Sequence, residues 1–444
     1  MNTINVLLLS PKKPEGSFIL PYEAKMKSFK ELQLSQPILQ ALESKGYTHP
    51  TAIQEQAIPY ILEGRDIFGS AGTGTGKTAA FAVPLLQLMS QEPTEQYSGV
   101  RTLVLAPTRE LAIQIGDSFR NYGKNLGLRS TVIYGGVSQH GQTAALRRGV
   151  DIIIATPGRL LDLINQGFIR LNSIKYLVLD EADHMLEMGF INDIKKIVAK
   201  VPTTRQTLFF SATVPVEIKR LVTAMLRNQV NVEVKSTIDS KANVKQSIFF
   251  VDRSHKKDLL CSLINEQAIN QALVFTRTKR GADKLVKSLN MLGIRAEAIH
   301  GNKSQSNRQR TLADFKSKKV GILVATDVAS RGIDVKELPY VINFDLPEQA
   351  ETYTHRIGRT ARAGATGIAL SFCSPDERYY LQGIQRYVGN NIPVEKHAFL
   401  NVPPKPHDES SSDRESDYNP NASANFRRRR RESSGPRSRA FYHN

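Results

Sequence analysis

The chain has 444 residues, enough for two or three domains that each bury their own core. Its 60 Lys and Arg residues against 42 Asp and Glu residues give a net charge of +18, which favours a polyanionic partner, nucleic acid first and an anionic membrane surface second. The two cysteines, Cys261 and Cys373, are too few and too far apart for a disulfide framework or a zinc site, and no apolar run is long enough for a membrane span, so we expect a cytoplasmic protein without a membrane partner.

The first 25 residues show no clean hydrophobic periodicity and contain three prolines. We therefore predict that residues 1–25 are a disordered extension or lie upstream of the true start, for which Met26 is the candidate. From Ser28 an apolar pattern with helical spacing runs to a turn at Gly46, which predicts an amphipathic helix.

A glycine-rich stretch follows the short apolar run Ile67-Phe68 and precedes an alanine-rich helix opening. Its glycines let backbone N–H groups turn toward one point, where the start of the next helix adds positive potential. Lys77 can reach phosphate oxygens, and the Thr78 hydroxyl can hold Mg²⁺. Ala71 stands where such loops usually have their first glycine. The stretch that predicts this nucleoside triphosphate site is Ala71-Gly72-Thr73-Gly74-Thr75-Gly76-Lys77-Thr78.

Five further apolar runs alternate with helical patterns, as in a parallel sheet with right-handed crossovers. A loop with polar or glycine residues follows each run, and such loops gather at one edge of a doubly wound sheet. The expected strands lie at 102–105, 131–134, 152–155, 177–180 and 207–210.

Three carboxylates follow the fourth of these strands, at Asp180, Glu181 and Asp183. At the carboxyl end of a buried strand, Asp180 can hold Mg²⁺ through water, and Glu181 can orient or deprotonate an attacking water. Such a cluster alone is more often a helix N-terminal cap. Because a phosphate loop precedes it in the same domain, we favour the catalytic interpretation.

The phosphate loop, the tetrapeptide Asp180-Glu181-Ala182-Asp183 and a series of further motifs in the same order resemble those of the DEAD-box ATP-dependent RNA helicases of superfamily 2. The resemblance runs from about Phe29 to about Gly367, and the short extensions are most similar to the bacterial RhlE-type subgroup. It implies an α/β fold with two tandem RecA-like doubly wound parallel-sheet domains joined by a short linker. It also implies ATP and Mg²⁺ as cofactors and RNA as the partner.

The resemblance assigns roles to residues of the first domain. Gln54 would read the adenine edge through its amide, and Phe29 would cover the base. Asp183, Ser211 and Thr213 would couple hydrolysis to strand separation. Loops on the shared sheet edge supply charge, hydroxyls and backbone N–H groups for a sugar-phosphate backbone, which predicts RNA binding with little sequence preference. The residues of these loops are Pro107, Thr108, Arg109, Gly135, Gly136, Thr156, Gly158 and Arg159.

A polar, aperiodic stretch at 236–243 predicts the linker, and a second alternating pattern predicts another doubly wound domain over 244–400. This domain has no phosphate loop, so its charged motifs must complete a site from across a cleft. Its expected strands lie at 248–251, 272–275, 296–299, 321–325, 341–344 and 368–372.

Arg356 and Arg359 are expected on one helical face, from which both would act as arginine fingers toward the γ-phosphate. Asp334 suits a ribose hydroxyl, and His355 joins the residues that couple the domains. Ala361 departs from the glycine usual in the family. The resemblance also implies RNA contacts in this domain by Thr276, Arg277, Gly301, Gln305, Arg308 and Thr326.

We thus predict an ATP-binding domain over 26–235, with the adenine-reading segment at 28–56, and a disordered arginine-rich tail over 401–444. The arginine run at 427–431 predicts a flexible arm that raises residence on RNA. The expected activity is RNA-stimulated ATP hydrolysis with local unwinding of single-stranded or short duplex RNA. By family habit, ribosomal precursors or RNA-decay complexes are the expected settings.

Two other functions stay open. One is an ATP-gated RNA scaffold or annealing chaperone with little unwinding, and the other is a DNA translocase of the same superfamily. The intact Lys77, Asp180, Glu181 and Arg359 argue against the scaffold, since a degraded enzyme is expected to have lost at least one of them. Stimulation of the ATPase by RNA but not DNA separates these functions.

Overall fold

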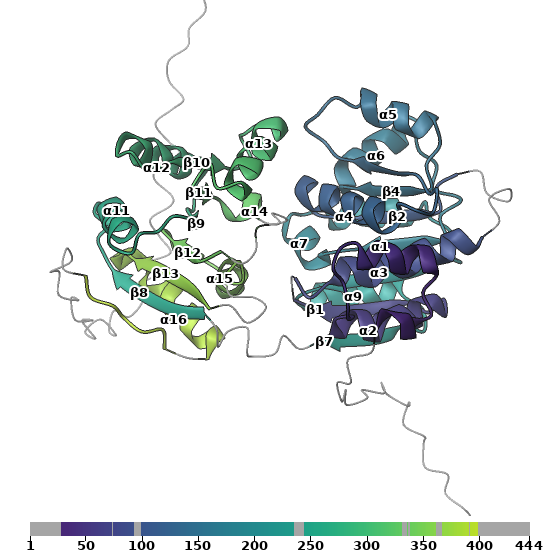
Figure 1. Ribbon diagram of the computed structural model, residues 1–444, viewed down its shortest axis with the longest axis horizontal. Coiled ribbons are helices and arrows are strands. Elements are labelled where there is room, and N and C mark those ends of the chain that lie inside the picture. Colours follow the sequence, from purple (N-terminus) through teal and green to yellow (C-terminus); the bar gives the residue numbers. More distant parts are fainter. Residues whose placement is uncertain are drawn as a thin grey trace, which may run out of the picture. The chain divides into compact units, whose positions relative to one another are not determined.

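The computed structural model describes residues 28–72, 74–92, 99–234, 244–330, 335, 338–360, 366–389 and 391–397. Within these ranges the chain forms two parallel sheets, and Figure 1 shows helices on both faces of each. None of the described helices is long and apolar enough to cross a membrane. The extension, linker and tail predicted at 1–25, 236–243 and 401–444 lie outside the described residues.

Two short helices occupy the N-terminal segment, where a single helix was expected. The 3₁₀-helix η1 (Phe29–Leu32) ends at Gln33, whose φ of +55° is left-handed and cannot continue a helix. The helix α1 (Gln36–Glu43) then begins with Pro37 in its first turn, the position in a helix that tolerates proline. The prediction of one continuous helix was therefore wrong.

The first sheet has seven parallel strands in the order β3-β4-β2-β5-β6-β1-β7. All five predicted strands are present, with ends within one residue of the prediction, and the run before the glycine loop forms β1. The seventh strand was not predicted, because its half-exposed, alternating residues carry no motif. The strands are β1 (Ile67–Ala71), β2 (Thr102–Leu105), β3 (Ser130–Ile133), β4 (Ile152–Ala155), β5 (Tyr176–Leu179), β6 (Gln206–Ser211) and β7 (Val230–Val234).

Hydrophobic side chains fill both faces of this sheet, because successive residues of a strand point to opposite sides. The helices that cover it are α2 (Ala52–Leu62), α3 (Lys77–Gln91), α4 (Arg109–Tyr122), α5 (His140–Arg147), α6 (Pro157–Asn165), α7 (Ala182–Glu187), α8 (Ile191–Val198) and α9 (Val216–Met225).

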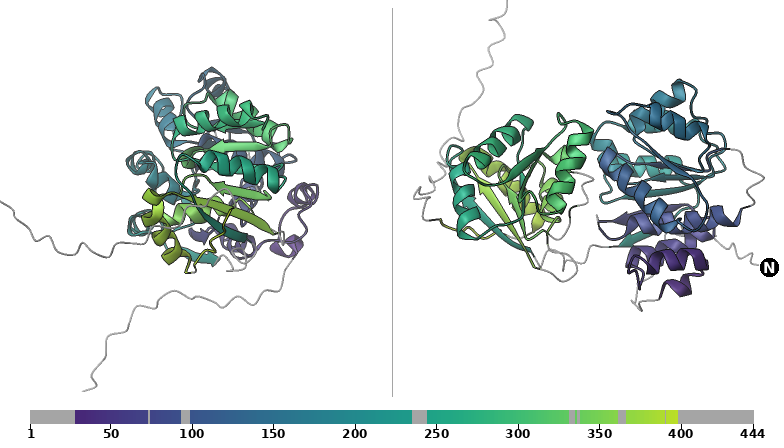
Figure 2. Two further views of the ribbon diagram at one scale, coloured as in Figure 1. Left: turned by 90° about the vertical axis from the view of Figure 1, so that its left-hand side faces the viewer. Right: turned by 45° about the horizontal axis from the view of Figure 1, so that its top comes forward.

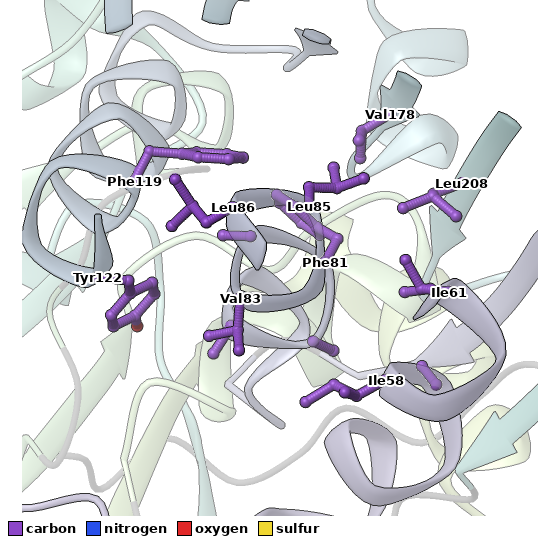
Figure 3. Close-up of a cluster of buried hydrophobic side chains, with 14 of the residues drawn as sticks. Ile58, Ile61, Phe81, Val83, Leu85, Leu86, Phe119, Tyr122, Val178 and Leu208 are labelled. Atoms are coloured by element: carbon purple, nitrogen blue, oxygen red, sulfur yellow. The ribbon is translucent and has the colours of Figure 1, made fainter. Parts of the chain in front are cut away.

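Helix α3, which carries the proposed phosphate lysine, is buried along most of its length. Each large apolar side chain it buries contributes roughly 1.5–3 kcal/mol, so the helix start is held firmly beneath the glycine loop. Figure 3 shows the packing around it, with Ile58 and Ile61 from α2, Phe81, Leu85 and Leu86 from α3, Phe119 from α4, and Val178 and Leu208 from the sheet.

The second sheet has six parallel strands in the order β10-β11-β9-β12-β13-β8, and all six were predicted. Strand β8 begins four residues earlier than expected. In the right-hand view of Figure 2, helices again lie on both sides of the strands. The strands are β8 (Val244–Phe250), β9 (Ala272–Phe275), β10 (Ala296–Ile299), β11 (Ile322–Ala325), β12 (Tyr340–Asn343) and β13 (Gly367–Cys373). The helices are α11 (Lys256–Glu266), α12 (Lys279–Met291), α13 (Gln305–Lys316), α14 (Asp327–Ser330), α15 (Ala350–Ile357), η3 (Pro375–Glu377) and α16 (Arg378–Val388).

Candidate functional site

The glycine loop connects β1 to α3, as predicted. Gly74 and Gly76 have φ values of +82° and +94°, which L side chains rarely adopt. A Cβ on Gly76 would lie only 2.4 Å from Nε2 of Gln54, so this turn requires glycine. Ala71, by contrast, is the last residue of β1 and pairs with Val234, so the position where the family has glycine needs none here. Thr73 lies outside the described residues.

Lys77 folds back over the loop that precedes it. Its Nζ donates to the carbonyl oxygen of Ala71 at 2.8 Å, and its side chain is buried. The Thr75 hydroxyl donates to the Gly72 carbonyl at 2.9 Å and closes the loop on itself. The lysine charge therefore sits at the centre of the loop, where a phosphate group would accept its hydrogen bonds in place of Ala71.

Asp180 directly follows β5 and is 2% exposed. Burial raises the pKa of its carboxyl to about 6, although the nearby Lys77 charge acts in the opposite direction. Its Oδ1 accepts a hydrogen bond from the backbone N–H of Glu181 at 3.0 Å. A carboxylate oxygen is a hard ligand of the kind that Mg²⁺ takes, and the contact of Asp180 to hydrated Mg²⁺ stays a prediction.

Glu181 is the N-cap of α7 and has left-handed backbone angles, φ +51° and ψ +51°. Its Oε2 lies 2.9 Å from Nδ1 of His184. Burial alone would raise the pKa of Glu181, but the His184 hydrogen bond and the charges of His184, Lys77 and Arg359 lower it to about 2. The carboxylate is therefore ionised at neutral pH and can accept a hydrogen bond from water.

Asp183 ties the loop after β5 to the loop after β6. Its Oδ2 accepts hydrogen bonds from the Ala212 N–H at 3.1 Å, the Thr213 N–H at 2.8 Å and the Thr213 hydroxyl at 3.1 Å. The Ser211 hydroxyl donates to the Thr213 carbonyl at 2.7 Å. The structure thus brings together the three residues of the first domain that were predicted to couple hydrolysis to strand separation. The fourth, His355, meets the His184 ring edge-on, with centroids 5.3 Å apart.

Gln54 lies on α2 and contacts the glycine loop. Its Nε2 donates to the Gly76 carbonyl at 3.1 Å, and its Oε1 accepts from the Thr51 N–H at 3.0 Å. The amide expected to read adenine is thus also a partner of the phosphate loop. Phe29, expected to cover the base, packs in the hydrophobic core and is only 4% exposed. Most of its ring is therefore covered by protein, and the adenine contacts of both residues stay predictions.

Three of the predicted RNA loops meet at the edge of the first sheet. The guanidinium of Arg109 lies so close over Gly136 that a Cβ there would be 2.2 Å from Nη1. Arg159 donates from Nη1 and Nη2 to the Val137 carbonyl at 3.4 and 3.3 Å. Thr108 caps α4, because its hydroxyl accepts from the Leu111 N–H at 3.3 Å. The two arginines and the glycines are therefore together, as predicted, while Thr108 has the structural role of a helix cap.

The remaining members of these loops differ in exposure. Pro107 and Thr156 are buried, Gly135 is half-buried, and Gly158 is exposed in the first turn of α6. Backbone N–H groups at the start of a helix are directed toward solvent and can donate to a phosphate. Gly158 is thus well placed for its predicted contact.

Gln305 and Arg308, in the first turn of α13, were predicted to contact RNA, and in the structure both contact a carboxylate of the protein. Gln305 Nε2 donates to Glu110 Oε1 at 2.9 Å, and Arg308 Nη2 lies 3.0 Å from the same oxygen. All three side chains are buried. A buried carboxylate needs such donors, so both side chains stabilise Glu110, and their RNA contacts stay predictions.

Arg277 also lies in an internal network. Its Nη2 donates to Glu377 Oε1 at 2.9 Å, and its guanidinium carbon lies 5.3 Å from the Tyr380 ring centroid. Thr276 and Thr326 are buried at the ends of β9 and β11. Gly301 packs near Lys279, whose Nζ would be 3.5 Å from a Cβ at this position. Thr276 and Thr326 are thus covered by protein, whereas Gly301 is exposed and the Arg277 side chain is partly exposed, and the RNA contacts of all four stay predictions.

Arg356 is buried on α15, which corrects the prediction that it points into a cleft. Its Nε and Nη2 bind both oxygens of Asp327, and its Nη1 donates to Asn343 Oδ1 at 3.0 Å and to the Asp345 carbonyl at 2.7 Å. Its guanidinium carbon lies 4.8 Å from the Phe275 ring centroid. With its donors occupied and 2% exposure, Arg356 is not available as an arginine finger.

Arg359 does not share a helical face with Arg356, because α15 ends at Ile357 and Arg359 lies in the following turn. It is close enough to Glu181 to lower the pKa of that carboxyl. Arg359 therefore keeps the candidate role of finger. Asp334 and Ala361 lie outside the described residues.

Sequence reasoning missed three residues that hold the site together: Asp327, Glu110 and His184. Glu110 directly follows Arg109, and Asp327 directly follows Thr326, both predicted RNA contacts. A rule that every buried arginine needs a carboxylate partner would have directed attention to these two carboxylates. His184 follows the acidic tetrapeptide directly, and its place in the first turn of α7 puts it three residues from Glu181.

We compared the chain with known protein families, curated proteins and solved structures. The DEAD/DEAH box helicase family profile matches residues 51–221, and the helicase conserved C-terminal domain matches residues 255–364. The chain is 45% identical over 361 residues to the DEAD-box ATP-dependent RNA helicase CshA of Bacillus cereus, which covers 81% of this chain and 68% of the relative. For CshA of Bacillus subtilis the identity is 43% over 359 residues, covering 81% of this chain and 72% of the relative.

Two solved structures resemble the whole described fold. Saccharomyces cerevisiae Dbp5 bound to RNA and ADP BeF3 has a TM-score of 0.74 and 30% identity, covering 83% of this chain and 95% of that chain. Mss116p bound to ssRNA and AMP-PNP has a TM-score of 0.76 and 27% identity, covering 85% of this chain and 81% of that chain. The RhlE-type subgroup stays a prediction. The family profiles, the identity with CshA and the two sheets together show that this chain belongs to the family of DEAD-box ATP-dependent RNA helicases.

Proposed function

We propose that this chain grips the backbone of single-stranded RNA with little sequence preference, hydrolyses ATP and unwinds short RNA duplexes locally. The observation that carries the proposal is a single sheet edge. It holds the phosphate loop with Lys77, the carboxylates Asp180 and Glu181, and the loops that contain Arg109 and Arg159. The residues proposed to bind ATP and those proposed to bind RNA thus follow strands of the same sheet.

The loop and Lys77 would bind the β- and γ-phosphates of ATP. Thr78, half-buried in the first turn of α3, and Asp180 offer hydroxyl and carboxylate oxygens, the hard ligands that hydrated Mg²⁺ prefers. When bound, Mg²⁺ supplies positive charge that stabilises the phosphate oxygens during transfer. Lys77, buried and held over the loop, would keep the phosphates aligned without a large rearrangement.

Glu181 would orient the attacking water and accept its proton. Arg359 would neutralise charge on the departing phosphoryl group, an effect worth about 10³ to 10⁵ in rate in related phosphoryl-transfer enzymes. Arg356 would act on this step only indirectly, by holding the loop that leads to Arg359.

On the RNA side, Arg109, Gly136 and Arg159 would contact phosphates, and 2′-hydroxyl contacts would favour RNA over DNA. The hydrogen bonds between Asp183 and Thr213 would transmit the state of the nucleotide to the rest of the sheet edge. A base-pair step costs roughly 1.4 kcal/mol to open, so unwinding would be limited to short duplexes.

The setting of this activity is also a proposal. The net charge of +18 and the arginine run at 427–431 suit large RNA assemblies such as ribosomal precursors or RNA-decay complexes in the cytoplasm. Binding would be dominated by phosphate contacts, and salt would weaken it steeply.

The test is ATP hydrolysis without nucleic acid, with single-stranded RNA and with DNA of the same sequence. We expect stimulation by RNA only. Glu181→Gln should nearly abolish turnover while keeping ATP-dependent RNA binding, and Glu217→Gln, an exposed change in the first turn of α9, should leave both unchanged. Equal stimulation by DNA would indicate a translocase, and ATP-gated RNA binding without turnover would indicate a scaffold.

A further inference from the structure

His184 is buried beside the proposed catalytic carboxylate, and the roles described above do not use it. Its Nδ1 lies 2.9 Å from Oε2 of Glu181, and the two residues are 2% and 8% exposed. Glu181 is the N-cap of α7 and His184 is the third residue of the helix, a spacing of three that places side chains next to each other. The contact is therefore a short-range feature of one helix start.

The direction of this hydrogen bond follows from the chemistry of its two partners. A glutamate that is to accept a proton from water must be ionised, and an ionised carboxylate can only accept hydrogen bonds. Nδ1 of His184 must then carry the hydrogen, whether the ring is neutral or charged. The imidazole acts as a donor that fixes one oxygen of Glu181 and leaves the other for water.

The backbone of Glu181 explains why such a donor is needed. Its φ of +51° is left-handed, a conformation that non-glycine residues rarely adopt and that the surroundings must enforce. A carboxylate on such a residue still rotates about its own side-chain bonds. A buried donor at a fixed position removes that freedom, and a general base is effective only in a narrow range of orientations.

His184 is itself held in place by contacts on two sides. Its backbone N–H donates to Asp183 Oδ1 at 3.1 Å, and the other oxygen of Asp183 binds the Thr213 loop. Its ring meets the His355 ring edge-on, with an interplanar angle of 85°. The imidazole therefore links Glu181 to the same residues that were predicted to couple hydrolysis to strand separation.

We propose that His184 is a positioning residue for hydrolysis, whose Nδ1–H holds Oε2 of Glu181 so that the second carboxylate oxygen faces the attacking water. This inference rests on the proposed role of Glu181. In this proposal His184 orients Glu181, and Glu181 accepts the proton of the attacking water.

The test compares amide side chains that differ only in where they place a donor. In His184→Asn the amide nitrogen replaces Nδ1, whereas in His184→Gln it replaces the far nitrogen Nε2. We expect His184→Asn to stay within about threefold of wild-type kcat and His184→Gln and His184→Leu to lose about tenfold or more, with KM for ATP and RNA affinity within about twofold of wild type. Rescue by asparagine is not expected of a histidine that only fills space.

Combination with Glu181→Gln supplies a second readout. If His184 acts through Glu181, His184→Leu should lower the residual turnover of the Glu181→Gln protein by no more than about twofold. Independent losses in the double variant, equal losses in all three single variants, or a rise in KM with unchanged kcat would each overturn the positioning role.

The same measurements separate this inference from the proposed function. If wild-type turnover is not stimulated by RNA, or if Glu181→Gln keeps full turnover, both the proposed function and the role of His184 fail. If these controls behave as expected and the His184 variants all match the wild type, only the role of His184 fails. Should His184→Leu not fold, the asparagine and glutamine variants alone decide.

Discussion

Arg356 binds Asp327 through two parallel hydrogen bonds, with Nε 2.6 Å from Oδ1 and Nη2 2.8 Å from Oδ2. This bidentate pairing joins the start of α14, just after β11, to the end of α15, and Nη1 adds bonds to Asn343 and the Asp345 carbonyl at the end of β12. A planar guanidinium satisfies all of these acceptors at once, which an ammonium cannot do. Arg356 therefore organises the carboxyl edge of the second sheet.

Replacing Arg356 and replacing Arg359 should have different effects on stability and on turnover. Arg356→Ala removes the guanidinium hydrogen bonds to Asp327, Asn343 and the Asp345 carbonyl, so we expect a loss of about 2 to 4 kcal/mol in folding free energy, with turnover falling as a consequence. Arg359→Ala should lower kcat by about 10³ with a much smaller change in stability. Thermal unfolding and ATPase kinetics of both variants measure the difference.

Arg356→Lys is the matched control, because it keeps the charge and removes the planar fork. It should unfold at a temperature between those of the wild type and Arg356→Ala. If Arg356→Ala is as stable as the wild type and its kcat falls as far as that of Arg359→Ala, Arg356 acts as an arginine finger after all.

Gly76→Ala should disrupt the phosphate loop for a steric reason beyond backbone strain. Its Cβ would meet the Gln54 amide at 2.4 Å and the Thr51 hydroxyl at 3.0 Å. We expect ATP affinity to fall about tenfold or more, because a loss of only ~1.4 kcal/mol in binding free energy lowers affinity tenfold. Gly64→Ala is the control, because Gly64 has a similar φ of +78° but open space around it. A nucleotide titration of both variants decides, and equal ATP affinities would contradict the steric argument.

The strand positions were predictable because each short apolar run is followed by a motif loop. Strands such as β4 and β9 are buried on both faces, so their sequences are continuous hydrophobic runs, Ile152–Ala155 and Ala272–Phe275. Strand β7 is half-exposed and reads as an alternating polar segment, so it was missed. The acidic tetrapeptide alone is more often a helix cap, and Glu181 does cap α7, so its catalytic interpretation depended on the phosphate loop that precedes it in the same domain.

The direction of arginine and glutamine side chains was not predictable from the sequence. Arg356, Arg308 and Gln305 all occur in motifs that suggest phosphate or RNA contacts, and all three bind protein oxygens in the structure. A carboxylate supplied by another segment decides the outcome, the buried Glu110 for Arg308 and Gln305 and the partly exposed Asp327 for Arg356, and its position depends on packing between distant segments. Periodicity along the chain contains no such information.

Asp183 should be important for stability as well as for coupling. Its Oδ2 accepts three hydrogen bonds from Ala212 and Thr213, and its Oδ1 accepts one from the His184 N–H. In Asp183→Asn one oxygen becomes an NH₂ group that faces a donor, so we expect a loss of about 1 to 3 kcal/mol and weaker stimulation of the ATPase by RNA. Thermal unfolding and RNA-stimulated ATPase measure both effects.

The control for this variant is Asp117→Asn. Asp117 forms an exposed ion pair with Arg120 at 2.7 Å, and such pairs contribute only about 0 to 1 kcal/mol. If Asp117→Asn lowers the folding free energy as much as Asp183→Asn does, the hydrogen bonds of Asp183 make no particular contribution to stability.

The two cysteines should differ sharply in reactivity. Burial raises the pKa of Cys373 to about 12, and the residue is fully buried in β13, so almost no thiolate forms at neutral pH. Cys261 is half-buried on α11, and burial raises the pKa of its thiol as well. At pH 8 a thiol reagent should label Cys261 slowly and Cys373 only after denaturation. Cys261→Ser should then leave the native protein unlabelled, and rapid labelling of that variant would contradict the burial of Cys373.

The arginine arm should control how strongly salt weakens RNA binding. Residues 424–444 contain seven Arg and one Glu, and each phosphate contact to a single strand contributes about 0.7 to the slope of log affinity against log salt. Deleting 424–444 should therefore weaken RNA binding and lower this slope by several units, while ATP hydrolysis without RNA stays unchanged. Replacing 427–431 by five glutamines keeps the length of the tail and separates charge from bulk. If the arm acts through phosphate contacts, the glutamine variant must reproduce most of the loss of slope, and an unchanged slope in both variants would rule the arm out.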